Sequence, residues 1–292
     1  MGRVVTHADA GLPQPENANA YTGSNTVESL VELARSDMNP SRRGVLGAAA
    51  YSAALAIPAW HDVVGRWEAV GSGRSQRIGF SDVETVTSMT EYLAELDARV
   101  GSRDTRPMAA SFLVNTVAPY LRADGSNEVR RAMLSAASFA CYNTGWMAVD
   151  EGLHGLAQRY YLKALELAGA AEDHLTYCHI LRGMSVQAVN LGHRTQALRL
   201  ASAARTAPAA GQRLSAFFAG QQAHCHAAAQ ERNRAFQALQ ATERAVDRAS
   251  SQVGTFGGFS AATLAYATSQ VQYELGDVRG SVRLPRTAFP AP

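Results

Sequence analysis

The residues with the clearest chemical potential are histidines and cysteines in the second half of the chain. His224, Cys225 and His226 are consecutive, and imidazole and thiolate are preferred ligands of zinc. Side chains two positions apart on a helix point about 200 degrees apart, so His224 and His226 cannot close on one ion. His174 and Cys178 are four positions apart and can share a helix face, but no second ligand pair accompanies them. We therefore expect packing or groove-lining roles for these residues and no metal cofactor.

The same residue types give little support for an enzyme. Cys178 and His179 are adjacent and lie on different helix faces, so the sequence favours a buried thiol over a nucleophile. The sequence contains no phosphate loop and no GxSxG or HExxH motif. Its 3 cysteines include no CxxC pair, which fits a reducing compartment better than a disulfide framework. We expect a cytoplasmic binding protein without catalytic residues or cofactors.

Composition and charge exclude several other classes. Hydrophobic residues make up 47% and charged residues 18% of the 292 residues, a balance typical of globular proteins. A protein that binds a phosphate backbone requires clustered cations, and the net charge of this chain is only +2. No apolar stretch reaches the roughly 18 residues that a membrane-spanning helix requires. We therefore expect neither direct nucleic-acid binding nor a membrane partner.

The elements that position these side chains are predicted to be helices. Beyond residue 80, apolar residues recur at spacings typical of helices, with almost no alternating strand pattern. Ser81 and Glu84 have the spacing of a capping box at the first of these helices. Short glycine-containing turns between the helices indicate antiparallel neighbours. The predicted helices cover residues 81–100, 106–121, 127–149, 153–168, 174–190, 194–206, 212–229, 234–249 and 259–275.

The first 80 residues are predicted to hold two smaller regions. Residues 1–40 comprise a linker and a short amphipathic helix, which Asn25 and Glu28 open and Asn39-Pro40 ends. Residues 41–80 comprise an alanine-rich apolar helix that bends near Pro58 and a Gly/Ser linker. Residues 81–292 then form a helical repeat domain.

A twin-arginine export signal is the alternative for part of this region. Ser41, Arg42 and Arg43 precede an apolar run that ends in small residues near Ala56, as in such signals. The 40 residues ahead of the pair are longer than the usual leader, which favours a packed helix. An exported binding protein is the corresponding alternative function.

A period runs through the repeat domain. Gly152 and Gly192 lie 40 residues apart, each in a predicted tight turn, and each is followed five positions on by an alanine. This alanine opens a small, large, small pattern. Copies of the pattern are Ala157, Tyr161 and Ala164; Ala197, Ala201 and Ala204; and Ala235, Leu239 and Thr242, with a weaker turn before Ser281. Helix pairs repeated every 38 to 46 residues predict a solenoid, because each pair buries its apolar face only against the next.

At these positions the chain resembles the tetratricopeptide repeat. The small residue at the helix crossing is matched by Gly145 and Ser185, whereas the first-helix aromatic position holds Cys141 and Leu181. We therefore predict an all-α fold, a tetratricopeptide-like α-solenoid of antiparallel helix pairs preceded by a linker and an alanine-rich helix.

A longer resemblance covers nearly the whole chain. Residues 36–60, 106–124, 145–178 and 181–193 resemble the region downstream of the DNA-binding domain in XRE-type helix-turn-helix regulators of high-GC bacteria. Many of these are labelled twin-arginine signal proteins. The resemblance implies a transcriptional regulator whose C-terminal repeats sense or dock a partner. Residues 1–15 are similar only to the tail of the DNA-binding domain, so we expect DNA binding only through a missing or separate helix-turn-helix.

The predicted ligand site is a groove. In a stacked array the first helix of each pair lines the concave side, and aromatic, arginine and amide side chains there suit a protein, a peptide or a small signalling ligand. The alternative is that Tyr142 and Trp146 belong to the core. A homodimer is compatible with such a module. The predicted binding residues are Tyr142, Trp146, Asp150, Arg182, Asn190, His224, Tyr266 and Gln270, and the same register places Val186, Gly220 and Glu274 beside them.

Overall fold

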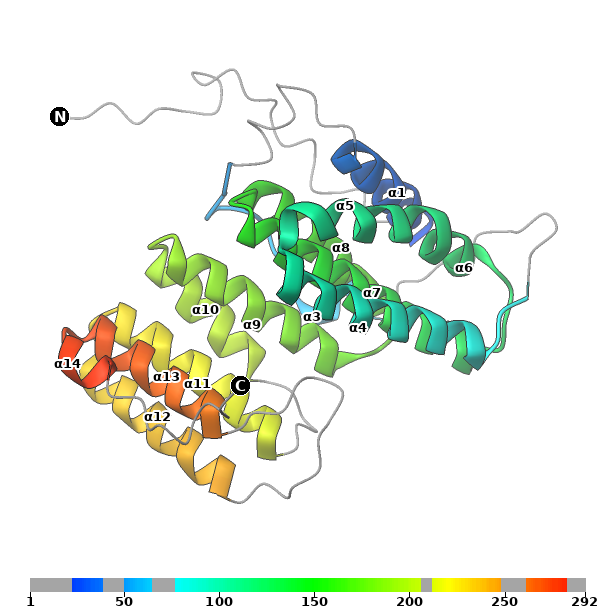
Figure 1. Ribbon diagram of the computed structural model, residues 1–292. Coiled ribbons are helices and arrows are strands. Elements are labelled where there is room, and N and C mark those ends of the chain that lie inside the picture. The colour runs from blue at the N-terminus through cyan, green and yellow to red at the C-terminus, as the bar shows by residue number, and fades with distance from the viewer. Residues whose placement is uncertain (1–22, 39–49, 65–76, 206–211, 248–260, 283–292) are drawn as a thin grey trace. The chain divides into compact units, whose positions relative to one another are not determined.

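The computed structural model describes residues 23–38, 50–64, 77–205, 212–247 and 261–282, which form helices and their connections (Figure 1). Within these residues β pairing is limited to an isolated bridge between Arg77 and Asp124. The predicted all-helical class is therefore confirmed. The chain divides into two compact units, residues 1–173 (unit 1) and residues 174–292 (unit 2). In the described ranges, no helix has both the length and the apolar character that crossing a membrane requires.

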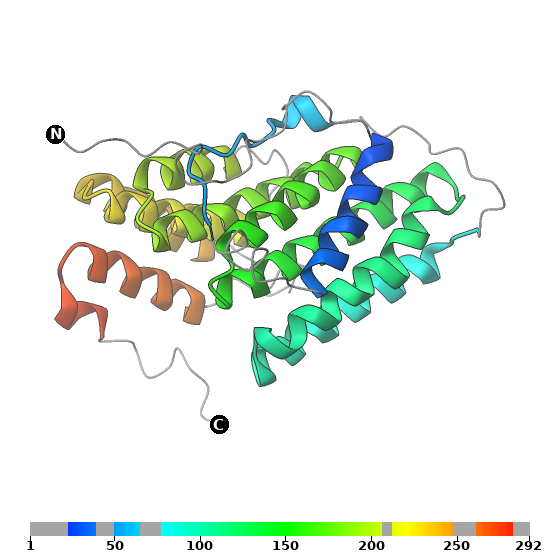
Figure 2. The ribbon, with the colours of Figure 1, turned by 90° about the horizontal axis from the view of Figure 1, so that it is seen from above.

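Unit 1 is built on a long helical hairpin. The hairpin consists of α7 (Asn127–Asp150) and α8 (His154–Ala170), which pack along each other. The other elements surround it: α4 and α5 pack on α7, while α1 and α3 pack on α8, and Figure 2 shows α1 running crosswise over its neighbours. These elements are α1 (Gly23–Met38), α3 (Trp60–Val63), α4 (Phe80–Val100), α5 (Ser102–Phe112), the π-helical turn η1 (Leu113–Val117) and α6 (Ala118–Arg122).

The crossing of α7 and α8 depends on a residue without a side chain. A Cβ added at Gly145 would lie 2.9 Å from Cε1 of Tyr161 and 3.2 Å from Cβ of Tyr160. Tyr160 and Tyr161 are both 0% exposed. The small residue predicted at the crossing therefore allows two large rings to fill the space between the helices.

Helix α1 belongs to the core of unit 1. Val27, Leu30 and Ala34 are each 0% exposed, and they repeat at the helical spacing of one buried face. Thr26 donates a hydrogen bond to Glu166 of α8 at 3.0 Å. At the other end Asp37 pairs with Arg106 of α5 and accepts a hydrogen bond from Tyr160 of α8. The short helix predicted ahead of the repeats thus forms and packs within the same unit as α7 and α8.

The helix predicted over residues 106–121 begins earlier and contains a wider turn. Elements α5, η1 and α6 follow one another without a break from Ser102 to Arg122. Pro119 has no N–H to donate to the carbonyl of Asn115, four positions earlier. The π-helical turn η1 ends at Val117, two positions before Pro119, so the chain loses this helical bond without leaving the helix.

The alanine-rich helix is a wrong prediction in its described part. Residues 50–59 form no helix, and helix resumes only in α3, Trp60–Val63. Two causes are visible. The residue before Pro58 is sterically biased away from helix, and Gln158 of α8 binds the main chain of Ser52 through both its amide atoms, at 2.8 and 2.9 Å. Residues 41–49, with the arginine pair, lie outside the described residues, as do the expected boundary at residue 40 and the part of the expected Gly/Ser linker up to residue 76.

The predicted capping box of α4 is also displaced. The helix begins at Phe80, and the carboxylate of Asp82 accepts a hydrogen bond from the main-chain N–H of Gly79 at 2.8 Å. The capping residue is therefore Asp82 rather than Glu84, and Ser81 lies inside the first turn. The expected pair, Ser81 and Glu84, lies two positions after the observed pair, Gly79 and Asp82. Both pairs have capping-box spacing, so the sequence alone does not choose between them.

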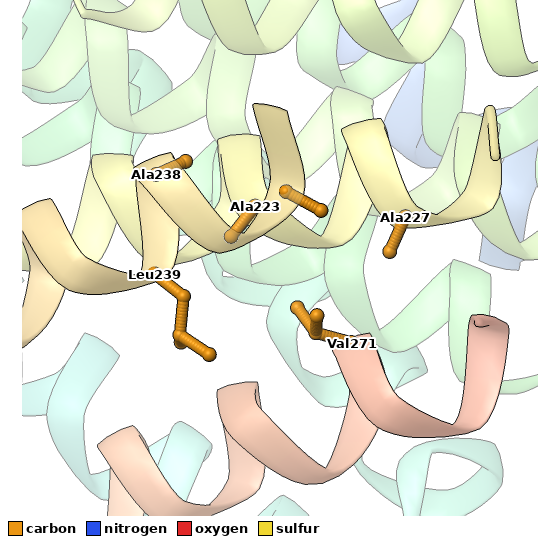
Figure 3. Packing of buried hydrophobic residues seen from close by; sticks show 6 residues of the cluster. Ala223, Ala227, Ala238, Leu239 and Val271 are labelled. Atoms are coloured by element: carbon orange, nitrogen blue, oxygen red, sulfur yellow. The ribbon is translucent and has the colours of Figure 1, made fainter. Parts of the chain in front are cut away.

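Unit 2 repeats the helical hairpin. Helices α9 and α10 pack together, α11 and α12 pack together, and α11 also contacts α9, α10 and α13. A small apolar core joins α11, α12 and α13, where Val271 of α13 points toward Ala223 and Ala227 of α11 (Figure 3). The elements are α9 (His174–Asn190), α10 (Arg194–Ala204), α11 (Gln212–Ala228), α12 (Arg232–Asp247), α13 (Ala261–Glu274) and α14 (Val278–Ser281).

One turn geometry recurs along the chain. At each of five helix ends a residue with positive φ donates its N–H three positions back, and the next residue donates five positions back. This left-handed cap satisfies carbonyls at the end of the helix. The predicted turn glycines are confirmed, and two other residue types occupy the same conformation. The five positions are Gly152, Glu172, Gly192, Gln230 and Gly276.

The small, large, small pattern is buried in its three full copies, whereas Ser281, after the weaker fourth turn, is half-buried. All members of the full copies are at most 6% exposed. The second helix of each of three hairpins, α8, α10 and α12, therefore presents the same face to its neighbours, as the pattern predicts. The nine residues are Ala157, Tyr161, Ala164, Ala197, Ala201, Ala204, Ala235, Leu239 and Thr242.

Candidate functional site

Two predicted binding residues of unit 2, Arg182 and His224, lie near Glu274, which the same register places beside them, and the three come from different helices. Arg182 comes from α9, His224 from α11 and Glu274 from α13. Nε2 of His224 lies 3.8 Å from Oε1 of Glu274. Burial lowers the pKa of this imidazole, and the charge of Arg182 acts on it in the same direction. Because α11 packs against both α9 and α13, the first helices bring these groups together.

An aromatic ring positions the cation. The Arg182 guanidinium lies over the ring of Phe217 of α11, with Cζ 4.0 Å from its centroid. The ring of His179 is stacked on Phe217 at 5.5 Å, with 13° between the planes. An arginine over an aromatic face is attracted by the ring quadrupole. Arg182 as a whole residue is half-buried, and its Nε is buried, so the base of the guanidinium is held inside the unit.

Both buried histidines of this cluster are neutral at pH 7. Burial, and secondarily the charge of Arg182, lowers the pKa of His179 to about 3. Burial also lowers the pKa of His224, with Arg182 lowering it further and Glu274 opposing the shift. Nδ1 of His224 is buried and has no hydrogen-bond partner among the described residues. A neutral imidazole carries one donor and one acceptor, so this ring retains hydrogen-bonding capacity.

The thiol beside His224 serves packing. Gln221 donates to Sγ of Cys225 at 3.5 Å, and Sγ lies 4.0 Å from Oγ of Ser185 on α9. Burial raises the pKa of Cys225 to about 11, despite the opposing effect of its hydrogen bonds with Ser185 and Gln221. A protonated buried thiol is a weak nucleophile and a weak metal ligand.

The remaining residues that the register selected in unit 2 range from exposed to buried. Asn190 is exposed at the end of α9, and Val186 is half-buried one turn before it. Tyr266 is 56% exposed on α13, and its hydroxyl accepts a hydrogen bond from Gln270 at 3.0 Å. Gly220 is buried on α11. Unit 2 therefore has a half-buried charged cluster and an exposed pair of hydrogen-bonding side chains on its first helices.

The three predicted residues of unit 1 divide between core and surface. Tyr142 is 6% exposed and stacks on Tyr161 with centroids 5.7 Å apart. Trp146 is half-buried, 6.2 Å from the ring of Tyr142. Asp150 is exposed at the end of α7, and partial desolvation together with Asp97 raises its pKa. The burial of Tyr142 matches the alternative in which it belongs to the core.

The histidine and cysteine pairs considered as metal ligands face different neighbours. Nδ1 of His226 lies 2.7 Å from Oε2 of Glu231, whereas His224 faces Glu274. Sγ of Cys178 lies 4.0 Å from the carbonyl of Ala203 on α10. Across the described residues, no group of 3 or more His, Cys, Asp and Glu side chains is placed to hold a metal ion.

Sequence reasoning missed two members of the unit 2 cluster. Phe217 supports both Arg182 and His179, and Gln221 donates to the thiol of Cys225. Phe217, Gln221 and His224 are spaced by four and three residues, so they share one face of α11. On α11 the groove register began at Gly220, and extending it one turn back finds Phe217.

Unit 1 also has an open cleft of about 540 Å³. It lies between α1 and the segment from η1 to α6, and none of its residues was predicted to bind a ligand. The lining residues are Glu28, Val31, Glu32, Arg35, Ser36, Val114 and Arg122. Glu28 and Arg122 form an ion pair at 3.3 Å across it.

Comparison with known proteins gives no relative: no protein-family model matches the chain, and no curated protein or solved structure matches it.

Proposed function

We propose that this chain is the ligand- or protein-binding helical repeat module of a transcriptional regulator, with DNA reached through a separate helix-turn-helix domain. Its hairpins are proposed to be tetratricopeptide-like repeats of a solenoid. Five turns of one geometry and three buried copies of the small, large, small pattern support this proposal. We infer that the module acts in the cytoplasm and catalyses no reaction.

One observation carries the binding proposal. His224 of α11 lies 3.8 Å from Glu274 of α13, and Arg182 of α9, which lies over Phe217 of α11, acts on the same imidazole through its charge. We name the exposed side of α9, α11 and α13, with this cluster and with Tyr266 and Gln270, the first-helix face. A fixed cation, an anion and amide and hydroxyl groups on one face are suited to a polar peptide segment or a compact polar ligand.

Export as a binding protein is the weaker candidate. Maturation at Ala56 or Ala59 would remove Ser52, and with it both hydrogen bonds to Gln158, which is 5% exposed. Removing one partner leaves a buried amide unsatisfied, which costs about 1–3 kcal/mol. A segment on which the packing of α8 depends is a poor signal peptide.

A thermal-shift screen of peptides and polar metabolites against the full chain tests the binding proposal. A ligand present at about 100 times its Kd stabilises the folded protein by roughly 2.7 kcal/mol. We expect ligands whose shift disappears in Arg182→Ala and persists in Arg199→Ala, an exposed arginine of α10. Ligands that stabilise both variants equally would place binding elsewhere.

The coding DNA upstream of the first codon tests the regulatory half of the proposal. We expect an in-frame stretch, or an adjacent gene, that encodes a helix-turn-helix domain. An in-frame stop codon directly upstream, together with no such neighbouring gene, would contradict it.

A further inference from the structure

Helix α4 has two apolar sides, and the packing of unit 1 covers one of them. Where α4 packs on α7 and α5, its buried residues are Val86, Thr90 and Leu93. The other side, the exposed stripe, has four residues at successive spacings of three, four and four positions, which place them along one side of the helix. The exposed stripe consists of Met89, Tyr92, Leu96 and Val100.

Three members of this stripe are large apolar side chains in contact with solvent. Met89 is 40%, Tyr92 51% and Val100 54% exposed, whereas Leu96 is half-buried. The stripe runs for about 17 Å along the helix axis. Single exposed apolar residues are ordinary, whereas contiguous apolar patches mark interaction surfaces. A partner element that follows α4 for three turns would bury all four side chains.

A row of carboxylates, the acidic row, runs beside the exposed stripe. Glu84, Glu91 and Glu95 are exposed and lie at spacings of seven and four positions, so they share one side of α4. Glu95 comes three positions after Tyr92, which makes the row and the stripe neighbours on the helix surface. The whole helix has five carboxylates and one arginine, a formal charge of −4. That arginine, Arg99, is exposed and lies 4.0 Å from Glu95, so the border of the stripe remains acidic.

The charge of α4 distinguishes among the surfaces that could cover the exposed stripe. A second copy of the chain, paired through α4, would bring the same acidic row to the interface, and like charges oppose association. Nucleic acid and anionic lipid are negatively charged as well. A helix with lysine or arginine beside its own apolar side is complementary to α4 in both respects, because its apolar side covers the stripe while its cations meet the carboxylates.

We propose that the exposed side of α4 is a docking surface for a basic amphipathic helix of a partner protein. The partner helix packs its apolar residues on the exposed stripe, Tyr92 included, and its cations pair with the carboxylates of the acidic row. Tyrosine is enriched among the residues on which the affinity of an interface depends most. This surface lies in unit 1 and shares no residue with the first-helix face, so the inference does not rest on the proposed function.

Fluorescence anisotropy of a labelled synthetic helix, titrated with the full chain, tests the proposal. The basic probe has leucines along one side and lysines along the other, and the acidic probe has glutamate in place of each lysine. We expect the basic probe to bind at least tenfold more tightly than the acidic probe at physiological salt. Tyr92→Ser removes the largest side chain of the exposed stripe and is expected to weaken binding of the basic probe about tenfold. Phe236→Ser, at a phenylalanine of α12 that is 37% exposed, should leave it unchanged.

A double charge reversal, Glu91→Lys with Glu95→Lys, tests the acidic row separately. It is expected to weaken binding of the basic probe about tenfold and to strengthen binding of the acidic probe. Glu243→Lys, at an exposed carboxylate of α12, is the matched control and should alter neither affinity appreciably. All the substituted side chains are exposed, so we expect unchanged helical circular dichroism.

Three results would overturn the proposal. The first is equal affinity of the full chain for the basic and acidic probes. The second is binding of the basic probe that Tyr92→Ser leaves intact, because the interaction would then be charge attraction alone. The third is a dimer in sedimentation that Tyr92→Ser dissociates, because the exposed stripe would then belong to a contact with a second copy.

Discussion

Burial keeps two histidines of unit 2 neutral, and this determines how the protein responds to acid. His179 is 6% exposed and His224 is 4% exposed. The pKa of His179 falls from 6.5 to about 3, chiefly through desolvation. Between these values an unfolded chain binds a proton at this site that the folded chain does not. His179 therefore leaves the free energy of unfolding unchanged above pH 6.5 and lowers it progressively as the pH falls from 6.5 toward 3.

We predict that His179→Phe removes much of this acid sensitivity. The substitution retains a ring that can stack on Phe217 and eliminates the titrating group. The slope for one such histidine is about 1.4 kcal/mol per pH unit, so the wild-type free energy of unfolding falls by roughly 2 kcal/mol more than that of the variant between pH 6.5 and 5. Urea unfolding at both pH values measures it, with exposed His61→Gln as the control. Parallel pH dependences in wild type and His179→Phe would contradict the prediction.

We predict that Gly145→Ala destabilises the protein despite a better helix former. Alanine gains about 1 kcal/mol over glycine in a helix interior. The added methyl group, however, would lie 2.9 Å from the buried ring of Tyr161, and overpacking costs about 1–3 kcal/mol. We expect a net loss of about 1 kcal/mol in urea unfolding and a larger loss for Gly145→Val. Ser88→Ala, at an exposed position of α4, should change stability little. Stabilisation by Gly145→Ala would show that α7 and α8 are not in such close contact.

At the scale of elements, α1 is fastened to unit 1 by a buried ionic network. Arg106 of α5 pairs with Asp37 of α1 and with Glu151 at the end of α7, and Tyr160 of α8 donates to Asp37 at 2.9 Å. Breaking a buried pair by removing one partner costs about 3–5 kcal/mol. Four elements therefore meet at one arginine.

We predict that Asp37→Ala lowers the free energy of unfolding by about 3 kcal/mol and releases α1, because Glu151 retains part of the charge compensation for Arg106. Glu28→Ala is the matched control on the same helix. Its pair with Arg122 has side chains that are 53% and 39% exposed, and such pairs contribute about 0–1 kcal/mol. Hydrogen exchange should show faster exchange of residues 26–38 in Asp37→Ala alone. Equal effects of the two substitutions would contradict the buried network.

We predict that glycine stabilises the protein at one of the two non-glycine turns and leaves its stability nearly unchanged at the other. Glu172 and Gln230 adopt φ of 57° and 63°, a conformation that costs other residues roughly 1 kcal/mol relative to glycine. Glu172→Gly removes an exposed ion pair to Arg131 and should stabilise by about 0.5 kcal/mol. Gln230→Gly removes a 2.8 Å hydrogen bond to the carbonyl of Glu274, which offsets the gain. Thermal unfolding of both variants shows which one has the higher Tm. We expect it to be Glu172→Gly, and greater stabilisation by Gln230→Gly would contradict the prediction.

At the scale of the whole molecule, periodic features of the sequence predicted most of the fold. The small, large, small copies and the turn glycines depend on local spacing, and the structure confirms their burial and their positive φ. The helix expected over residues 50–59 failed because alanine content favours helix only where no competing contact exists. There the main chain of Ser52 is bound by Gln158, which is 106 positions away. No local pattern contains that contact.

The candidate site was predictable only in part for the same reason. The repeat register brought Arg182, His224 and Glu274 into one list, and these groups do interact. It also selected Tyr142, whose burial depends on the ring of Tyr161 and on the absence of a side chain at Gly145. Register fixes the face of a helix, whereas burial depends on the sizes of residues on the facing helix.

The central claim, that a ligand binds along the first-helix face, is tested most directly by hydrogen exchange of the full chain with and without the strongest ligand from the thermal-shift screen. We predict slower exchange in residues 182–190 of α9, 220–228 of α11 and 266–274 of α13, and unchanged exchange in α10 and α12. Protection confined to α10 and α12, or protection that persists in Arg182→Ala, would contradict the account.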